Sequence, residues 1–296
     1  MSATALALVV CAGLIHALWN IVAKKADGDV RFAAFTGLIG AVIWAPLGIW
    51  LGWSVVPTWG VTEWAFVLVS GAVHVLYYIT LLRGYRRSDL TVVYPMARGT
   101  GPLLSSLVAI FLLDERITLF GVLGIAAVVT GVFFIAGGPG LLRAVHDTDD
   151  VEKRARIHKG MAYGVLTGIF IAGYTVIDGY AVKILLMSPI LLDYFGNLLR
   201  LVFLLPPLLR DRKSIRGLWQ RQWKHALIIA AISPVGYVMV LYAMQTAPLS
   251  HVAPAREVSM LFAALLGGQL LGEGDRVLRI CGAACIAFGV MALALG

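Results

Sequence analysis

Charged residues are scarce in this sequence: Asp, Glu, Lys and Arg make up only 14% of its 296 residues. A soluble domain averages about a quarter charged residues, so the composition excludes a soluble globular protein. With 60% hydrophobic residues and a mean hydropathy of +0.87, the chain is predicted to be an integral membrane protein. Its net charge of +8 indicates loops against an anionic membrane surface and no nucleic-acid partner.

Motifs of enzymes and ATP-driven pumps are missing as well. The sequence has no Gly-x-x-x-x-Gly-Lys-Ser/Thr, no His-Glu-x-x-His and no Gly-x-Ser-x-Gly. "GEGD", 272–275, matches the Gly-x-Gly-Asp signature of intramembrane aspartyl proteases, but it lies in a turn without a Tyr-Asp partner motif. The three cysteines, Cys11, Cys281 and Cys285, lie in apolar segments. We predict no enzyme activity, no metal and no cofactor, and keep an intramembrane enzyme as the least favoured alternative.

Long apolar runs dominate the sequence. A membrane-spanning helix needs roughly 20 mostly apolar residues, and ten such runs follow one another. The first lacks the basic start and cleavage site of a signal peptide, so we expect it to be retained. The predicted spans are 3–23, 31–52, 64–83, 91–113, 118–137, 160–182, 188–209, 224–244, 251–271 and 277–295.

One polar segment separates the fifth span from the sixth. "RAVHDTDDVEKRARIHK", 143–159, carries acidic and basic residues in near balance, which is typical of a solvated linker. We predict a first five-helix repeat over 1–137, a charged cytoplasmic linker over 138–159, and a second five-helix repeat over 160–296.

Lys and Arg are unevenly distributed among the connections. Of the 24, nineteen fall in the loops after the odd-numbered spans or at the edges of those loops, two fall in the other loops, and three lie deeper inside spans. The positive-inside rule places the odd-numbered loops in the cytoplasm. We therefore predict a multi-pass protein of the cell inner (plasma) membrane with both termini on the outer side.

The two halves match each other at a shift of 158 residues. Rare polar residues recur in register inside apolar segments, and an odd number of spans in each half requires the second half to be inverted. Inverted repeats around a site near the midplane are typical of secondary transporters. The matching pairs include Lys25 with Lys183, Arg98 with Arg256, Glu115 with Glu273, Gly124 with Gly282, and Gly131 with Gly289.

Three stretches resemble the EamA group of the drug/metabolite transporter superfamily. "YPMARGTGPLLSSLVAIFLLDERITLFGVLGIAAVVTGVFFI" is similar to the end of one repeat, "HVAPAREVSMLFAALLGGQLLGEGDRVLRICGAACIAFGVMALA" to the same unit again, and "HALWNIVAKKA" to the first helix. The resemblance implies a ten-helix fold of two inverted halves around a central cavity, and solute transport without a specified substrate. Many members keep both termini in the cytoplasm, whereas the charges here argue the reverse.

Ionisable groups inside membrane spans are costly and are functional candidates by default. Basic and acidic residues balance, which indicates either internal pairing or a site for solutes that carry both charges. The six residues are Arg98, Arg200, Arg256, Asp178, Asp193 and Glu257.

Two of these arginines stand beside helix-breaking residues. Arg98 lies within "YPMARGTGP", 94–102, next to Tyr94, and Arg256 follows Pro254. We predict that both helices open locally beside a cavity, where a planar guanidinium can bind two oxygens of a carboxylate or phosphate. The alternative is that both side chains extend to the lipid headgroups.

The first helix of each half carries a second group of candidates. His16, Trp19 and Asn20 lie close together on the first helix, and Tyr174 and Asp178 occupy the positions that match His16 and Asn20. They can receive an ammonium group or a ring, and Asp178 can instead carry a coupling proton. The alternative is hydrogen bonding between helices.

Two further clusters are weaker. Tyr78 is included in the predicted site, although an aromatic core would also explain its grouping with His74 and Tyr77. "DYFGNLLR" places Asp193, Asn197 and Arg200 along one helix face, where we predict a structural or coupling role.

The sequence thus predicts an all-α integral membrane protein of ten transmembrane helices in two inverted five-helix repeats. It is predicted to be an exporter or exchanger of small polar metabolites, such as amino acids or organic anions, acting by alternating access. A lipid or lipid-linked carrier flippase of the same fold is the main alternative, and a homodimer is left open. The predicted substrate-binding residues are His16, Trp19, Asn20, Tyr78, Tyr94, Arg98, Tyr174, Asp178, Arg256 and Glu257.

Overall fold

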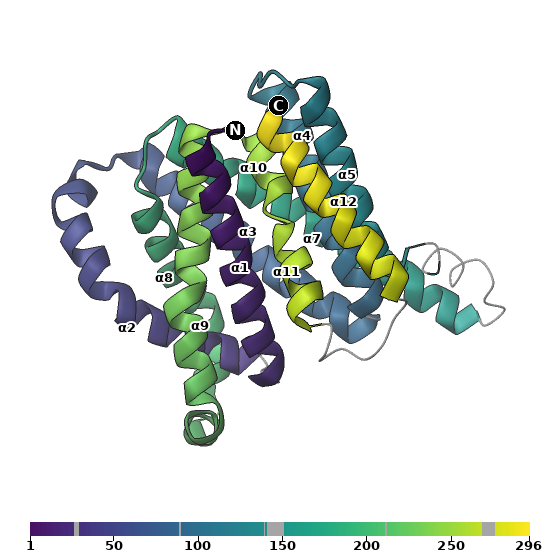
Figure 1. Ribbon diagram of the computed structural model, residues 1–296. Coiled ribbons are helices and arrows are strands. Elements are labelled where there is room, and N and C mark those ends of the chain that lie inside the picture. The colour runs from purple at the N-terminus through teal and green to yellow at the C-terminus, as the bar shows by residue number, and fades with distance from the viewer. Residues whose placement is uncertain (27–29, 89, 139, 141–150, 211, 268–275) are drawn as a thin grey trace.

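The computed structural model describes residues 1–26, 30–88, 90–138, 140, 151–210, 212–267 and 276–296. The regular elements of this part of the chain are helices (Figure 1). The first half comprises α1 (Ala3–Ala26), α2 (Val30–Val55) with a short 3-10 turn (Val56–Thr58), α3 (Val61–Arg87), α4 (Leu90–Leu112) and α5 (Leu119–Ile135). The second comprises α7 (Val151–Lys183), α8 (Pro189–Arg210), α9 (Arg212–Thr246), α10 (Leu249–Ala255), α11 (Val258–Gly267) and α12 (Arg276–Leu295).

Seven of the described helices are long and apolar enough to cross a membrane, and α5 is a shorter apolar helix. Helix α4 and the interrupted pair α10–α11 complete the ten passes. The predicted fold class is confirmed: this is an all-α membrane protein of two repeated halves. Helices α2, α4 and α5 begin at residues that correspond, within one residue at the 158-residue shift, to the starts of α8, α10 and α12.

Four glycines show that the second half is inverted. A Cβ added at Gly131 would lie 2.6 Å from the carbonyl oxygen of Gly282, and one added at Gly124 would lie 2.9 Å from that of Gly289. Helices α5 and α12 therefore touch backbone to backbone and run antiparallel, as small residues permit inside a membrane. Because Gly124 matches Gly282 and Gly131 matches Gly289 in the repeat, the contacts are reciprocal, as a two-fold axis requires.

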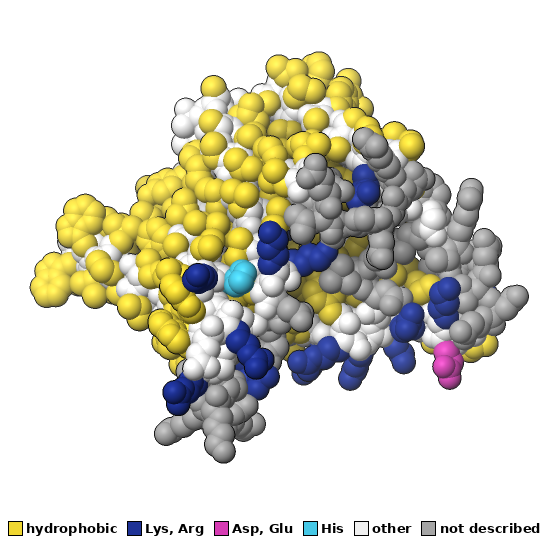
Figure 2. Space-filling model, turned by 60° about the horizontal axis from the view of Figure 1, so that its bottom comes forward, with side chains coloured by type: hydrophobic (Ala, Val, Ile, Leu, Met, Phe, Trp, Pro, Cys, Tyr) yellow, Lys and Arg dark blue, Asp and Glu magenta, His cyan; other side chains and the backbone are white. Residues whose placement is uncertain are grey.

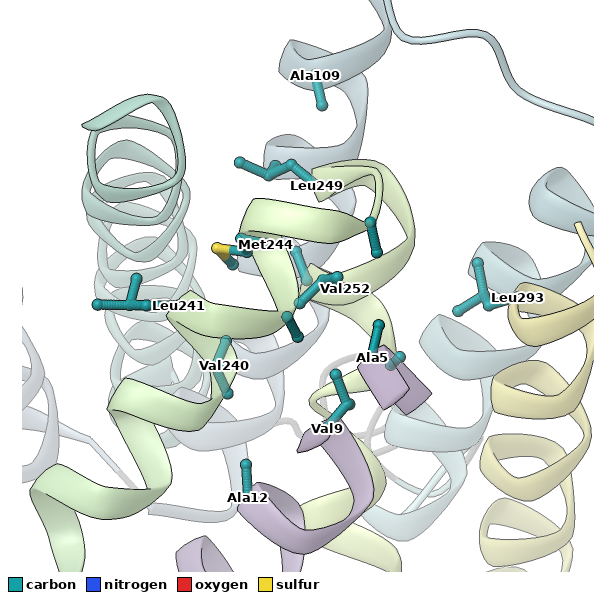
Figure 3. Close-up of a cluster of buried hydrophobic side chains, with 14 of the residues drawn as sticks. Ala5, Val9, Ala12, Ala109, Val240, Leu241, Met244, Leu249, Val252 and Leu293 are labelled. Carbon is teal, nitrogen blue, oxygen red and sulfur yellow. The ribbon is translucent and has the colours of Figure 1, made fainter. Parts of the chain in front are cut away.

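The main apolar core lies between the halves. Figure 3 shows Ala5, Val9 and Ala12 of α1 near side chains of α9 and α10, such as Val240 and Val252. All five are inaccessible to solvent. Because lipid tails are as apolar as these side chains, close packing is what holds such helices together.

The two ends of the bundle differ in charge. Lys and Arg side chains gather on the end shown in Figure 2, where α1 finishes with Lys24 and Lys25 and α3 with Arg86 and Arg87. Both chain termini lie at the opposite end (Figure 1), and the Met1 ammonium group donates a hydrogen bond of 2.9 Å to a backbone carbonyl of α12.

One sequence-based expectation needs correction. Helix α4 runs unbroken through Pro95, Arg98 and Pro102, so the expected local opening occurs only at its counterpart, between α10 and α11. Helix α7 begins at Val151, so the end of the predicted linker is helical. The rest of that segment (139 and 141–150) and the "GEGD" turn lie outside the described residues.

Candidate functional site

A central cavity of about 690 Å³ lies between the two halves, within the usual size range of small-molecule sites. Its wall is built by α1, α2, α3 and α4 from the first half and by α7, α8, α9 and the α10–α11 junction from the second. Eleven of the thirteen predicted site residues border it: His16, Trp19, Asn20, Tyr78, Tyr94, Arg98, Tyr174, Asp193, Asn197, Arg200 and Arg256. The other two, Asp178 and Glu257, are buried behind the wall, with 1% of each residue exposed.

The α10–α11 junction is made of tight turns beside a proline. The Glu257 amide donates to the Pro254 carbonyl over 2.9 Å, and the Ser259 amide donates to the Arg256 carbonyl over 3.2 Å. These three-residue spacings replace the four-residue pattern of an α-helix. The helix therefore ends at Ala255 and restarts at Val258, which presents Arg256 and Glu257 in different directions.

Arg98 is held by the far side of this junction. Its Nε lies 2.9 Å from Oε2 of Glu257, and its Nη2 donates a 2.9 Å hydrogen bond to the hydroxyl of Ser259. The guanidinium also lies over the ring of Tyr94, 5.9 Å from its centre. Arg98 thus links α4 to α11 and neutralises the buried carboxylate of Glu257.

Arg256 has no such partner. It is 5% exposed and borders the cavity. In the described part of the chain, no carboxylate lies within 4.0 Å of its guanidinium, and its Nε has no hydrogen-bond partner. Among the described residues this is a buried positive charge that faces the cavity without a directly paired carboxylate, since Glu257, which also lies within its electrostatic influence, pairs with Arg98.

The polar residues of α8 are engaged with one another and with α2. Nη2 of Arg200 lies 3.4 Å from Oδ1 of Asp193, and its Nε donates to the Gly196 carbonyl over 3.3 Å. The Asn197 amide donates to the Gly37 carbonyl of α2 over 3.2 Å. All three side chains border the cavity, and Asn197 ties α8 to α2.

Aromatic rings form another part of the wall. His74 of α3 stacks on Tyr174 of α7 with ring centres 4.0 Å apart, and Tyr77 meets the same tyrosine edge-on at 5.7 Å. Tyr237 of α9 approaches His74 at 5.9 Å. His74, Tyr77 and Tyr78 all border the cavity, and Tyr77 also packs against the buried cluster around Tyr174, so the aromatic-core explanation stays open.

Tyr237 is a cavity residue that the sequence did not reveal. Its hydroxyl donates a 2.5 Å hydrogen bond to Oδ2 of Asp178. Its counterpart in the first half is Ile79, so the repeat gave no signal, and a lone tyrosine in an apolar span is unremarkable.

The group on α1 is ordered by its own hydrogen bonds. Nε1 of Trp19 donates to Nδ1 of His16 over 2.9 Å, and the Asn20 amide donates to the His16 carbonyl over 2.6 Å. Nε2 of His16 is left without a protein partner in the described residues. One ring nitrogen is therefore buried without a hydrogen-bond partner among the described residues, close to Gly236 of α9.

Glu115, outside the cavity, fixes the start of α10. Its carboxylate accepts hydrogen bonds from the amides of Leu249 and Ser250, at 2.8 and 2.9 Å, and pairs with Lys183 at 2.9 Å. Burial alone would raise the pKa of Glu115, but the Ser250 and Lys183 hydrogen bonds outweigh it and hold the pKa below its usual value. This carboxylate satisfies donors at a helix start that has no side-chain cap of its own.

Comparisons with known proteins agree with this architecture. No curated protein matches the sequence. A solved structure described as "Crystal structure of protein" has the same fold, with a TM-score of 0.71 at 15% identity, and the match covers 100% of this chain and 98% of that one. The profile described as "EamA-like transporter family" matches residues 3–137 and again 158–295. The chain therefore belongs to the EamA-like transporter family of the drug/metabolite transporter superfamily, with one copy of the domain in each half.

Proposed function

We propose that this protein is a secondary transporter of small polar metabolites that carry an anionic group, such as amino acids or organic anions, and that it has no enzymatic role. The observation that carries the proposal is Arg256, a buried guanidinium on the cavity wall with no carboxylate within 4.0 Å among the described residues. Family membership supports a transport function, and the buried guanidinium of Arg256 supports a solute with a negatively charged group.

A buried charge without a partner is expensive. A solute carboxylate or phosphate beside Arg256 would remove that cost, because the planar guanidinium can donate two parallel hydrogen bonds to it. The remaining arginines of the wall are less available, since Arg98 faces Glu257 and Arg200 faces Asp193. Arg256 is therefore the anchor in this proposal.

The aromatic wall suits the rest of the solute. The rings of Tyr77, Tyr174 and His74 offer surfaces against which an apolar or cationic group can pack. His16 and Asn20 border the same cavity and add polar groups to its wall. A zwitterion of amino-acid size fits this combination of groups.

Transport would proceed by alternating access, with the two inverted halves rocking around the cavity. The Lys- and Arg-rich end in Figure 2 faces the cytoplasm in this proposal, and both termini face outward from the inner membrane.

The proposal is tested by thermal stabilisation of the purified protein against amino acids, organic acids, phosphates, phosphonates, quaternary amines and lipids. A ligand that binds the folded state at about 100 times its Kd stabilises it by about 2.7 kcal/mol. We expect stabilisation by anionic or zwitterionic compounds, lost in Arg256→Gln. Stabilisation by lipids alone would refute the proposal in favour of a flippase, and stabilisation only by quaternary amines would refute the role of Arg256.

A further inference from the structure

The three acids inside the membrane spans differ in their partners. Asp193 lies 3.4 Å from Arg200, and Glu257 lies 2.9 Å from Arg98. Asp178 of α7 is as buried as Glu257, with 1% of its surface exposed, yet no Lys, Arg or His of the described chain lies within 4.0 Å of its carboxylate.

The contacts of Asp178 suit an uncharged acid. Oδ2 accepts the hydrogen bond of the Tyr237 hydroxyl, and Oδ1 has no hydrogen-bond partner in the described residues. Ser70 of α3 approaches the carboxyl group without reaching hydrogen-bond geometry; its hydroxyl lies 3.3 Å from Nδ1 of His74. One hydrogen bond does not compensate an ionised carboxylate in a low-dielectric interior, and such a group takes up a proton instead.

The surrounding charges leave Asp178 without a counter-ion. On α8, Arg200 and Asp193 act on it in opposite directions and are paired with each other. Among the described residues, the titratable groups around this carboxyl group also include His74 and Tyr77 on α3, Tyr174 on α7 and Tyr237 on α9, which are themselves influenced by Arg98 of α4 and Arg256 after α10.

Asp178 does not border the cavity, but it is linked to the cavity wall through a hydrogen bond from Tyr237. Tyr237, its hydrogen-bond donor, and Tyr174, one helical turn earlier on α7, both belong to the wall. The Tyr237 hydroxyl therefore stands between the carboxyl group and the solvent of the cavity, where it can relay a proton.

From this placement we propose that Asp178 is a proton-binding site that couples transport to the pH gradient, an inference that rests on the carrier function proposed above. The carboxylate takes up one proton, with the Tyr237 hydroxyl as relay and no other bond changed, and releases it when the cavity opens to the other side. The matching residue of the first half is Asn20, an uncharged analogue of a protonated aspartate, so the inverted halves provide one such site.

Infrared spectroscopy of the full-length protein in lipid vesicles, with isotope-labelled aspartate, tests the proton directly. As the pH is lowered below neutral we expect the carbonyl stretch of a protonated aspartic acid to appear, lost in Asp178→Asn and kept in the matched control Asp193→Asn. The absence of the band from wild type, or its survival in Asp178→Asn, would overturn the proposal. If Asp178→Asn does not fold, the Asp193→Asn variant still tests the proposal. Loss of the protonated-aspartate band in that variant would assign the band to Asp193 and overturn the proposal.

A second measurement separates coupling from transport. Vesicles that trap a pH-sensitive dye are exposed to a mixture of the common amino acids, and the wild-type lumen is expected to change pH while Asp178→Asn does not respond. Uptake of labelled amino acids without any pH change would refute coupling and leave the carrier proposal intact. No uptake at all, with the infrared band present, would refute the proposed solute class and leave the proton site supported.

Discussion

Helix α4 and the α10–α11 pair occupy equivalent positions in the two inverted halves, yet only the second is interrupted. Helix α4 contains Pro95 and Pro102 and stays continuous from Leu90 to Leu112. Its counterpart contains one internal proline, Pro254, and ends at Ala255 before restarting at Val258. The number of prolines therefore does not decide where a membrane helix breaks.

The neighbours of the two segments explain part of this difference. Helix α4 lies directly on α7: a Cβ added at Gly164 would fall 2.5 Å from Cβ of Met96, and one added at Gly168 would fall 2.7 Å from Cβ of Thr100. Such close backbone packing supports a helix that has lost a hydrogen bond at each proline.

The residues that follow each arginine in the sequence explain why Arg98 is paired with a carboxylate and Arg256 is not. Arg98 is held by Glu257 and Ser259 of the other half. By the repeat, the equivalent partners of Arg256 would be residues 99 and 101, and both are glycines. One arginine is therefore neutralised by the protein, while its counterpart is left for a ligand.

The largest effect is expected from removing the neutralised arginine. Arg98→Gln leaves the buried Glu257 carboxylate without a counter-charge, which should lower the free energy of unfolding by about 3–5 kcal/mol. The double variant Arg98→Gln/Glu257→Gln should recover most of that loss. Unfolding in detergent measures both, and a double variant as unstable as the single one would contradict the pairing.

The corresponding substitution, Arg256→Gln, is expected to affect stability differently from Arg98→Gln. Without a ligand, Arg256→Gln removes a buried charge that has no directly paired carboxylate among the described residues, so the free energy of unfolding should stay unchanged or rise. The same unfolding measurement applies, with Arg98→Gln as the comparison. Equal destabilisation by the two variants would mean that Arg256 also has a partner within the protein.

A smaller effect concerns the start of α10. Glu115→Gln should lower the free energy of unfolding by about 1–3 kcal/mol, because it weakens hydrogen bonds to a charged group. The pKa of Glu115 is depressed in the folded state, so its contribution is present above the usual value of 4.5 and is lost as the pH falls through the lower folded pKa. Stability measured against pH should therefore fall less steeply on the acid side in the variant; parallel curves would exclude this role.

Much of the architecture could be predicted from the sequence, because hydrophobic length and the 158-residue repeat are local or internal signals. The residues of the cavity wall followed from the cost of polar groups in spans, which singled out Arg98, Arg200 and Arg256. The break after Ala255 was predicted from Pro254, but the continuity of α4 through its two prolines could not be, since it depends on packing against α7. The pairing of Arg98 with Glu257 and the contact of Tyr237 with Asp178 join distant parts of the chain. No motif or residue spacing in the sequence indicates either contact.

The most direct test of the unpaired arginine is to supply the missing partner. An added Cβ at Gly99 would meet nothing within 4 Å, so Gly99→Glu can place a carboxylate where the repeat predicts a partner for Arg256, and Gly99→Gln is the uncharged control of the same size. Binding of the anionic panel compound that most stabilises the wild type is measured in all three proteins. Binding is expected to be at least about tenfold weaker, or about 1.4 kcal/mol, in Gly99→Glu and close to wild type in Gly99→Gln. Undiminished binding in Gly99→Glu, or equal loss in both variants, would contradict this expectation.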